Sequence, residues 1–220
     1  MKLSKETVEI LKNFATINTN LIINPGKKIS TMSATKDIFA EYNGVDEFDK
    51  KVSIFNLSEL LGAFSAFSDT ELILEDKNLV IKQGKAQVKY VYADENVLIT
   101  PKKSITMPSA EIEVNLSADL LASLQKMSAI LSVEDLAIVG NGKTISVKVL
   151  DKKNPTANSF VIDLEVKSKE VFQVNFKVEK LRMIPDDYKV EISSKKISKW
   201  TASGINLVVF VAVESDSVFN

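Results

Sequence analysis

The amino-acid sequence predicts an α+β protein with two similar domains, each a duplicated unit of one short helix and several antiparallel strands. Three observations lead to this fold class. A capped, amphipathic helical pattern occurs four times at nearly even spacing, and alternating apolar and polar runs follow each copy. The 220 residues suit two domains of about 110 residues each. Helices gathered on one face of a sheet are a standard layered arrangement for such units.

The four helical patterns share a polar capping residue and an apolar stripe at helical spacing. The segments are MKLSKETVEILKNF from residue 1, IFNLSELLGAF from residue 54, VNLSADLLASLQKM from residue 114 and QVNFKVEKLRM from residue 173. We expect Ser4, either Asn56 or Ser58, and Ser117 to cap the first three helices. The fourth helix is the shortest, and we expect Pro185 to end it.

Turn residues divide the stretches after the helices into strands. The strongest hairpin signal is Asn141-Gly142, which separates two β-rich runs. Similar breaks occur at residues 25–26, 35–36, 76–78 and 83–85. The stretch 95–109, which contains Pro101 and Pro108, is extended without clear alternation. We interpret it as a connector between a domain at 1–94 and a second domain at 110–220.

Composition excludes several classes of site. The chain has no Cys, so neither disulfides nor thiolate metal ligands are possible, and a reducing compartment is expected. It has no His, which removes the commonest general base and metal ligand. The 28 basic and 29 acidic residues nearly cancel, so bulk charge does not attract nucleic acid. No apolar run approaches the roughly 18 residues of a membrane span, and charged residues interrupt the N-terminus where a signal peptide would be apolar.

Two local patterns that suggest chemistry are better explained as turns. The run VGNGKT ends like a phosphate-binding loop, but position 137 is Ala where that loop needs Gly, and a β-rich run follows instead of a helix. The acidic pairs Asp186-Asp187 and Asp46-Glu47 lie at turn signals, where Asp is common. No combination of nucleophile, base and orienting group is visible.

The sequence resembles the sliding DNA clamps that serve as polymerase processivity factors of T-even-type bacteriophages. The opening MKLSKETVEILKNFATIN carries the closest match, and IPDDYKVEI and the ending LVVFVAVESDS support it. The resemblance covers the full length, although the middle is similar in pattern more than in residue identity. In that family, each subunit has two domains of duplicated helix-plus-strand architecture. Three subunits close head to tail into a ring with helices lining the hole.

The resemblance implies a binding protein with no catalysis of its own and no cofactor or metal. It would encircle duplex DNA as a homotrimer and tether the replicative DNA polymerase, in the cytoplasm of the infected bacterial host and away from membranes. A clamp loader and transcription factors of late phage genes are further expected partners. A protein held on DNA by topology needs only weak, sequence-independent phosphate contacts, which agrees with the near-zero net charge.

Residues facing DNA are expected on the helix sides that oppose or flank the apolar stripes. The basic candidates are Lys5, Lys12, Lys126, Lys177, Lys180 and Arg182. Lys5 and Lys12 are seven residues apart and share one side, although a solvated face with a Lys5–Glu9 pair also explains them. Arg182 matches a basic position of the family. The second helix has no Lys or Arg on its outer side, so it would add shape and little attraction.

Clamps of this family receive short hydrophobic peptides from the polymerase and the loader, in a pocket near the connector and the C-terminal strand. The apolar candidates here are Leu98, Ile99, Ile105 and Met107 on the connector and Val209 and Val211 on the last strand. The alternative is that these residues cover the sheet and join the core, as most apolar strand residues do.

Two other function classes stay open at this point. A non-catalytic, structural β-rich phage protein would share the strands and short helices, but it predicts no basic bias on the helix faces and no closed trimer. An enzyme would need a cleft with perturbed titratable groups, built without His or Cys. The symmetry of the oligomer distinguishes the clamp from both alternatives.

Overall fold

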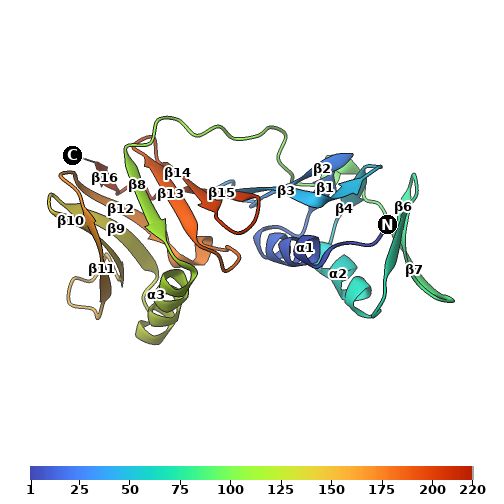
Figure 1. Ribbon diagram of the computed structural model, residues 1–220, viewed down its shortest axis with the longest axis horizontal. Coiled ribbons are helices and arrows are strands. Elements are labelled where there is room, and N and C mark those ends of the chain that lie inside the picture. The colour runs from blue at the N-terminus through green and yellow to red at the C-terminus, as the bar shows by residue number, and fades with distance from the viewer. Residues whose placement is uncertain (220) are drawn as a thin grey trace. The chain divides into compact units, whose positions relative to one another are not determined.

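The computed structural model describes residues 1–219, which form two compact units (Figure 1). Unit 1 contains residues 1–105 together with residues 206–209, and unit 2 contains residues 106–205 and the chain from residue 210 onward. Both units combine antiparallel sheets with few helices, as the α+β prediction requires. Within residues 1–219, no helix has the length and apolarity that crossing a membrane needs.

Unit 1 places two helices against three small groups of strands. Its elements are α1 (Lys5–Ile17), β1 (Leu21–Ile23), β2 (Gly26–Met32), β3 (Ile38–Phe48), β4 (Val52–Ile54), α2 (Leu57–Ser65), β5 (Glu71–Leu74), β6 (Asn78–Gln83), β7 (Ala86–Val91) and the 3₁₀ turn η1 (Glu95–Val97). β1 pairs with β4, β2 pairs with β3, and β5, β6 and β7 form a three-stranded sheet.

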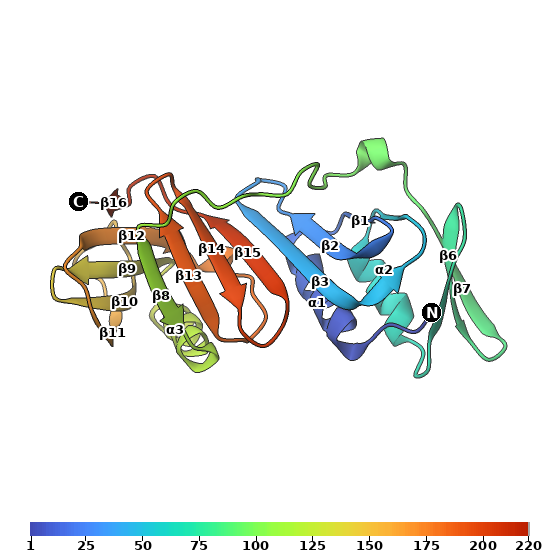
Figure 2. The same ribbon diagram turned by 45° about the horizontal axis from the view of Figure 1, so that its top comes forward.

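Local sequence explains where the helices of unit 1 begin. Ser4 Oγ accepts the Thr7 N–H at 3.1 Å, and Asn56 Oδ1 accepts the Glu59 N–H at 3.2 Å. Ser4 is therefore the predicted N-cap of α1, and Asn56 rather than Ser58 caps α2. The stripe of α1 that includes Ile10, Leu11 and Phe14 is buried, and α1 packs against β3 and α2 (Figures 1 and 2).

Unit 2 is built from one helix and two larger runs of strands. Its elements are β8 (Ile112–Leu116), α3 (Ala118–Leu131), β9 (Asp135–Asn141), β10 (Thr144–Leu150), β11 (Phe160–Lys167), β12 (Val171–Lys177), the 3₁₀ turn η2 (Val178–Lys180), β13 (Tyr188–Ser193), β14 (Ile197–Ala202) and β16 (Val218–Phe219). The strand β15 (Leu207–Ala212) belongs to unit 1 up to residue 209 and to unit 2 from residue 210. One sheet has the order β11-β10-β9-β12-β16, and β14, β13 and β8 are successive neighbours in another.

The predicted hairpin at Asn141-Gly142 joins β9 and β10. Gly142 has a φ of 80°, a conformation that a residue without a Cβ adopts at little cost. Two residues earlier, Gly140 lies opposite Phe172 of β12, whose ring occupies the space that a Cβ at Gly140 would fill. The Asn-Gly sequence and Gly140 therefore fit the register of this sheet.

The predicted fourth helix at residues 173–183 is wrong. β12 extends through Lys177, and only the three-residue turn η2 follows it. The run from Phe172 to Val178 alternates between aromatic or β-branched residues and polar ones, and β12 pairs with β9 over seven positions. Phe172, Val174 and Phe176 are buried on the strand, so burial on a pleated sheet prevails over the weak helical pattern.

The core of unit 2 centres on Trp200, which is fully buried on β14. Its ring makes edge contacts with Phe176 and Tyr188, at centroid distances of 5.8 and 6.3 Å. Trp200 Nε1 donates a hydrogen bond to Ser198 Oγ at 2.9 Å, so its one polar group is satisfied. Aromatic pairs at these distances and angles add to the area burial of the rings.

Candidate functional site

The outer side of α1 carries basic and acidic residues in equal measure. Lys5 and Lys12 are exposed, as predicted for one side of the helix. Lys12 Nζ lies 2.7 Å from Glu9 Oε1, whereas Lys5 has no ion pair or hydrogen-bond partner for its ammonium within residues 1–219. The Lys5–Glu9 pair considered from the sequence is therefore replaced by a Lys12–Glu9 pair. Lys5 is the cation of this face that is available to an external anion.

A groove between α1 and α2 collects further basic groups. It has a volume of about 460 Å³, and its lining includes Lys2, Lys5, Lys12 and Phe64. Lys2 Nζ lies 2.7 Å from Asp69 Oδ1, and this hydrogen bond raises the pKa of Lys2. α2 contributes no basic residue, and Glu59 lies exposed in its first turn. The groove is thus basic along its α1 side only.

Lys126 is exposed on α3, among small residues. Its exposed neighbours along the helix include Ala122, Ser123 and Ala129. Its ammonium makes no ion pair or hydrogen bond with any residue in the part of the chain that the structure describes. Ala122, Ser123 and Ala129 are short and leave the charge accessible on their side of the helix, whereas Ile130 is a longer exposed neighbour.

Lys177 and Lys180 are neutralised by acidic residues of their own unit. Lys177 Nζ lies 2.8 Å from Asp135 Oδ1, and Lys180 Nζ lies 2.9 Å from Glu214 Oε1. The hydrogen bond to Asp135 raises the pKa of Lys177 and favours its charged form. Both lysine side chains are less than a quarter exposed, so they mainly hold β12 and η2 to neighbouring segments.

Lys152 completes this ionic cluster. Its Nζ lies 2.9 Å from Asp216 Oδ2 and 3.8 Å from both Asp135 and Glu214. The hydrogen bond from Lys152 holds the pKa of Asp216 below its ordinary value of 3.8. The Asp135 carboxylate is almost completely buried, and two lysines balance its charge. No sequence pattern indicates this cluster, because its members come from separate strands and loops.

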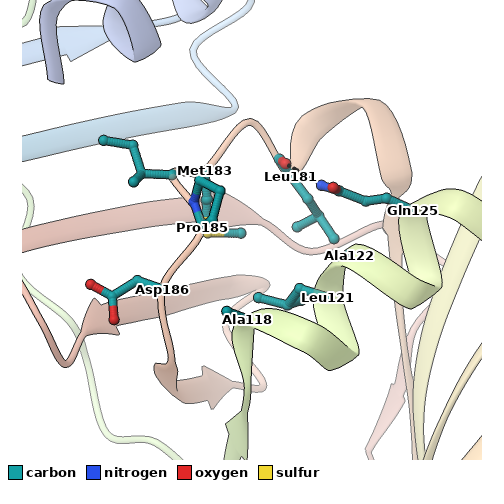
Figure 3. Close-up of a pocket in the computed structure, with 9 residues that line it drawn as sticks. Ala118, Leu121, Ala122, Gln125, Leu181, Met183, Pro185 and Asp186 are labelled. Carbon is teal, nitrogen blue, oxygen red and sulfur yellow. Dashed lines mark hydrogen bonds between the residues drawn. The ribbon is translucent and has the colours of Figure 1, made fainter. Parts of the chain in front are cut away.

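Arg182 is exposed just beyond η2. Its Nε donates a hydrogen bond to the Glu179 carbonyl at 3.0 Å, which fixes the base of the guanidinium group. The residues on both sides of it lie against α3, where Gln125 Nε2 donates to the Leu181 carbonyl at 3.1 Å (Figure 3). The cavity along this seam has a volume of only about 50 Å³. It is too small for an organic ligand, so the seam is a packing contact.

The predicted peptide-pocket residues divide into a surface group and a core group. On the connector, Ile99 and Ile105 are exposed, and Leu98 and Met107 are half-buried. Val209 and Val211 are fully buried on β15, so they offer no surface of their own. In unit 1, Leu98, Thr100 and Pro101 of the connector line a groove of about 440 Å³ together with Ile22 and Ser30 of β1 and β2.

Several surface features were not predicted from the sequence. Phe55, Val97 and Ile130 are each about 60% exposed. Asn18 and Asn20, between α1 and β1, bind the backbone of the connector at Ile99. Asparagine after a helix usually indicates only a cap or a turn, so neither residue stood out.

Residues 1–219 contain no group of three or more acidic side chains placed to hold a metal ion. Exposed basic residues lie on α1 in unit 1, and on α3 and beyond η2 in unit 2. Such an arrangement can contact a phosphate backbone without reading bases.

Comparison with known proteins decides the family. No protein-family profile matches the chain. The sliding clamp of Escherichia phage RB69 is 30% identical over 228 residues, which cover 99% of this chain and 98% of the relative. The chain belongs to the sliding-clamp family. The sliding clamp of Enterobacteria phage T4 is also 30% identical, over 226 residues with the same coverage.

Solved structures of other proteins are similar to this chain in their fold. The proliferating cell nuclear antigen (PCNA) of Thermococcus kodakaraensis matches with a TM-score of 0.70 at 11% identity, over 96% of both chains. At that identity the likeness concerns the fold alone. It confirms the predicted clamp fold, whereas the phage relatives confirm the family resemblance.

Proposed function

We propose that three copies of this chain close head to tail into a ring that encircles duplex DNA and tethers the replicative DNA polymerase. The observation that carries the proposal is the full-length similarity to phage sliding clamps, combined with two units of helices and antiparallel sheets. In this arrangement the helices line the hole and the sheets form the outer wall. Ring closure then holds the protein on DNA without strong adhesion, and the clamp itself catalyses no reaction.

Two strand edges support head-to-tail assembly. β7 is an outer strand of the three-stranded sheet in unit 1, and β11 is an outer strand of the five-stranded sheet in unit 2. At the opposite edge of the unit 1 sheet, Met1 and Leu72 exchange backbone hydrogen bonds, so β5 is already covered. An uncovered edge presents unpaired N–H and C=O groups, to which another chain can add a strand.

The side chains of these two edges are complementary. Val91 follows the basic residues Lys85 and Lys89 at β7, whereas β11 carries the acidic residues Asp163 and Glu165. Apolar surface accompanies the charges, since Val91 is 65% exposed and Val161 is 53% exposed. An edge of one sign that meets an edge of the other sign makes a heterologous contact, and such contacts produce closed rings when the rotation closes.

Charge reversal tests this assembly. The wild-type protein is expected to have a native mass of about 73 kDa, three times the 24.3 kDa chain. The double variant K85E/K89E and the double variant D163K/E165K should each weaken the trimer by at least tenfold. The quadruple variant that combines them should regain it, because every interface then has opposite charges again. A monomeric wild-type protein at high concentration would contradict the ring.

Contacts with DNA are expected to be few. Lys5 and Lys126 are exposed, and Arg182 is exposed and matches a basic position of the family, so these three are the strongest candidates. Lys12, Lys177 and Lys180 each lie close to an acidic side chain. The double variant K126E/R182E should shorten retention on DNA severalfold and lower the salt dependence of binding by about 0.9 for each lost phosphate contact. K195E, a reversal on the β13–β14 turn, is the matched control. Equal retention of both variants would remove Lys126 and Arg182 from the DNA-facing surface.

The proposed partners follow from tethering. A peptide of the DNA polymerase would dock near the connector residues Leu98, Ile99, Ile105 and Met107, with Val209 and Val211 supporting the sheet beneath. A weak contact with a ring that cannot leave the DNA keeps the polymerase at a high effective concentration near its template. A clamp loader and late-gene transcription factors are further proposed partners, in the cytoplasm of the infected bacterium.

A further inference from the structure

Two asparagine side chains replace a partner strand at one residue of the connector. Asn20 Oδ1 accepts the Ile99 N–H at 3.0 Å, and Asn18 Nδ2 donates to the Ile99 carbonyl at 2.7 Å. In an antiparallel ladder, a hydrogen-bonded residue pair exchanges these same two bonds through backbone groups. Ile99 is thus held as if it belonged to a sheet, although residues 98–111 contain no regular strand.

The two asparagines are themselves fixed by further bonds. Asn20 is buried, and its Nδ2 donates to the Phe55 carbonyl at 2.7 Å. Asn18 Nδ2 also donates to the Met32 carbonyl at 2.8 Å, and Asn18 Oδ1 accepts the Asn20 N–H at 2.9 Å. The pair therefore joins the connector to the ends of β2 and β4. A polar network with every member satisfied is rigid and specific.

Burial contributes little to this attachment. The Ile99 side chain is 46% exposed, so hydrogen bonds rather than apolar contacts hold the connector at this point. Leu98, whose backbone is extended, lines the groove of about 440 Å³ between the connector and β1–β2. The place at which Ile99 is held therefore decides how far Leu98 and Thr100 stand from Ile22 and Ser30 across that groove.

We propose that Asn18 and Asn20 are positioning residues, which hold the connector at Ile99 and so set the width of the groove in which a polymerase peptide docks. The docking step rests on the proposed function, whereas the hold on Ile99 does not. Because the attachment consists of two hydrogen bonds at one residue, it can open locally while the rest of unit 1 stays folded.

Amide hydrogen exchange tests the hold on Ile99, and polymerase binding tests its effect on docking. In the full-length N18A/N20A variant, the Ile99 amide should exchange at least tenfold faster than in wild type, while amides of β3 and β6 keep their rates. The affinity for the DNA polymerase encoded by the same phage should fall about tenfold. N20D keeps an acceptor for the Ile99 N–H, so it should retain most of the protection. N43A removes an exposed asparagine of unit 1 and is the matched control.

The outcomes separate the possible failures. Unchanged exchange at Ile99 in N18A/N20A would overturn the hold, and faster exchange with undiminished polymerase affinity would overturn the positioning role. If the wild-type chain does not bind the polymerase, the proposed function itself fails. Should N18A/N20A not fold, N18D carries the test, because it loses the donor to Ile99 but keeps the acceptor for the Asn20 N–H.

Discussion

Unit 1 and unit 2 bury similar apolar segments in different secondary-structure elements. Unit 1 has two helices, α1 and α2, whereas unit 2 has α3 and the single turn η2. The four segments look alike as apolar patterns, but in the segment before η2 aromatic or β-branched residues alternate with polar ones, and it becomes a strand. A repeated apolar pattern thus predicts a buried element at each position, while the residue types decide whether it is a helix or a strand.

The basic residues also differ, between those on the helices α1 and α3 and those that border η2. Lys5 on α1 and Lys126 on α3 are exposed and have no acidic partner within residues 1–219. Lys177 and Lys180, which border η2, are paired with Asp135 and Glu214. On α1 and α3, one lysine of each helix is thus left without an acidic partner among the described residues. Where the helix is missing, the lysines stabilise the unit itself.

The largest expected effect comes from the core of unit 2. Trp200→Ala removes a fully buried ring that contacts Phe176 and Tyr188, and it should lower the free energy of unfolding by about 3–5 kcal/mol. Phe14→Ala in α1 is the matched change in unit 1, since Phe14 is also fully buried. Calorimetry should show each variant lowering the stability of its own unit. If both variants lowered the stability of one shared unfolding transition equally, the idea that each residue stabilises its own unit would be contradicted.

The second prediction separates lysines that look equivalent in the sequence. Lys177→Ala leaves the buried Asp135 carboxylate with only the more distant Lys152, and it should cost about 2 kcal/mol of stability. Lys126→Ala should change stability by less than about 0.5 kcal/mol, because this exposed side chain has no partner. Urea unfolding measures both values. A Lys126 variant that is as unstable as the Lys177 variant would refute the distinction.

The third prediction compares the caps of the two units. Ser4 Oγ accepts the Thr7 N–H and also donates to Asp46 Oδ2 at 2.8 Å, so Ser4→Ala should cost about 1–2 kcal/mol. Ser117 Oγ accepts only the Leu120 N–H, at 3.3 Å, so Ser117→Ala should cost about 0.5–1 kcal/mol. Thermal unfolding of the two variants under the same conditions shows which one loses more stability. The reverse order would show that Asp46 does not strengthen the first cap.

The smallest expected effect concerns pH. The pKa of Asp216 is lowered because Lys152 hydrogen-bonds its carboxylate, so the charged form stabilises unit 2 above the ordinary pKa of 3.8. This contribution is lost as pH falls from about 4 through the lower folded-state pKa. Asp216→Asn should therefore reduce the loss of stability of unit 2 below pH 4. An identical pH profile for the variant and wild type would exclude Asp216 as a contributor.

Local signals were the predictable part of the fold. The caps Ser4 and Ser117 and the Asn141-Gly142 turn depend only on residues a few positions away in the sequence. The structure confirms all three predictions. The fourth helix was mispredicted because β12 pairs with β9, whose residues lie 30 to 42 positions earlier in the sequence, and such pairing is not a local property.

Site residues were less predictable because charge partners are distant in the sequence. Lys177 and Asp135 are 42 positions apart, and Asn18 and Ile99 are 81 apart. The sequence identified the basic residues near the helices, but which of them are neutralised depends on strand pairing. The burial of Val209 and Val211 likewise depends on the sheet that surrounds β15. Their proposed roles at a partner pocket stay predictions.

Retention on circular DNA tests the central claim most directly. The clamp would be loaded by its loader onto nicked circular duplex, washed at high salt, and followed before and after a single restriction cut. The account predicts that the clamp stays on the intact circle in salt that abolishes phosphate contacts and leaves within minutes once the DNA is linear. Equal retention on circular and linear DNA would contradict a ring that holds DNA by enclosing it.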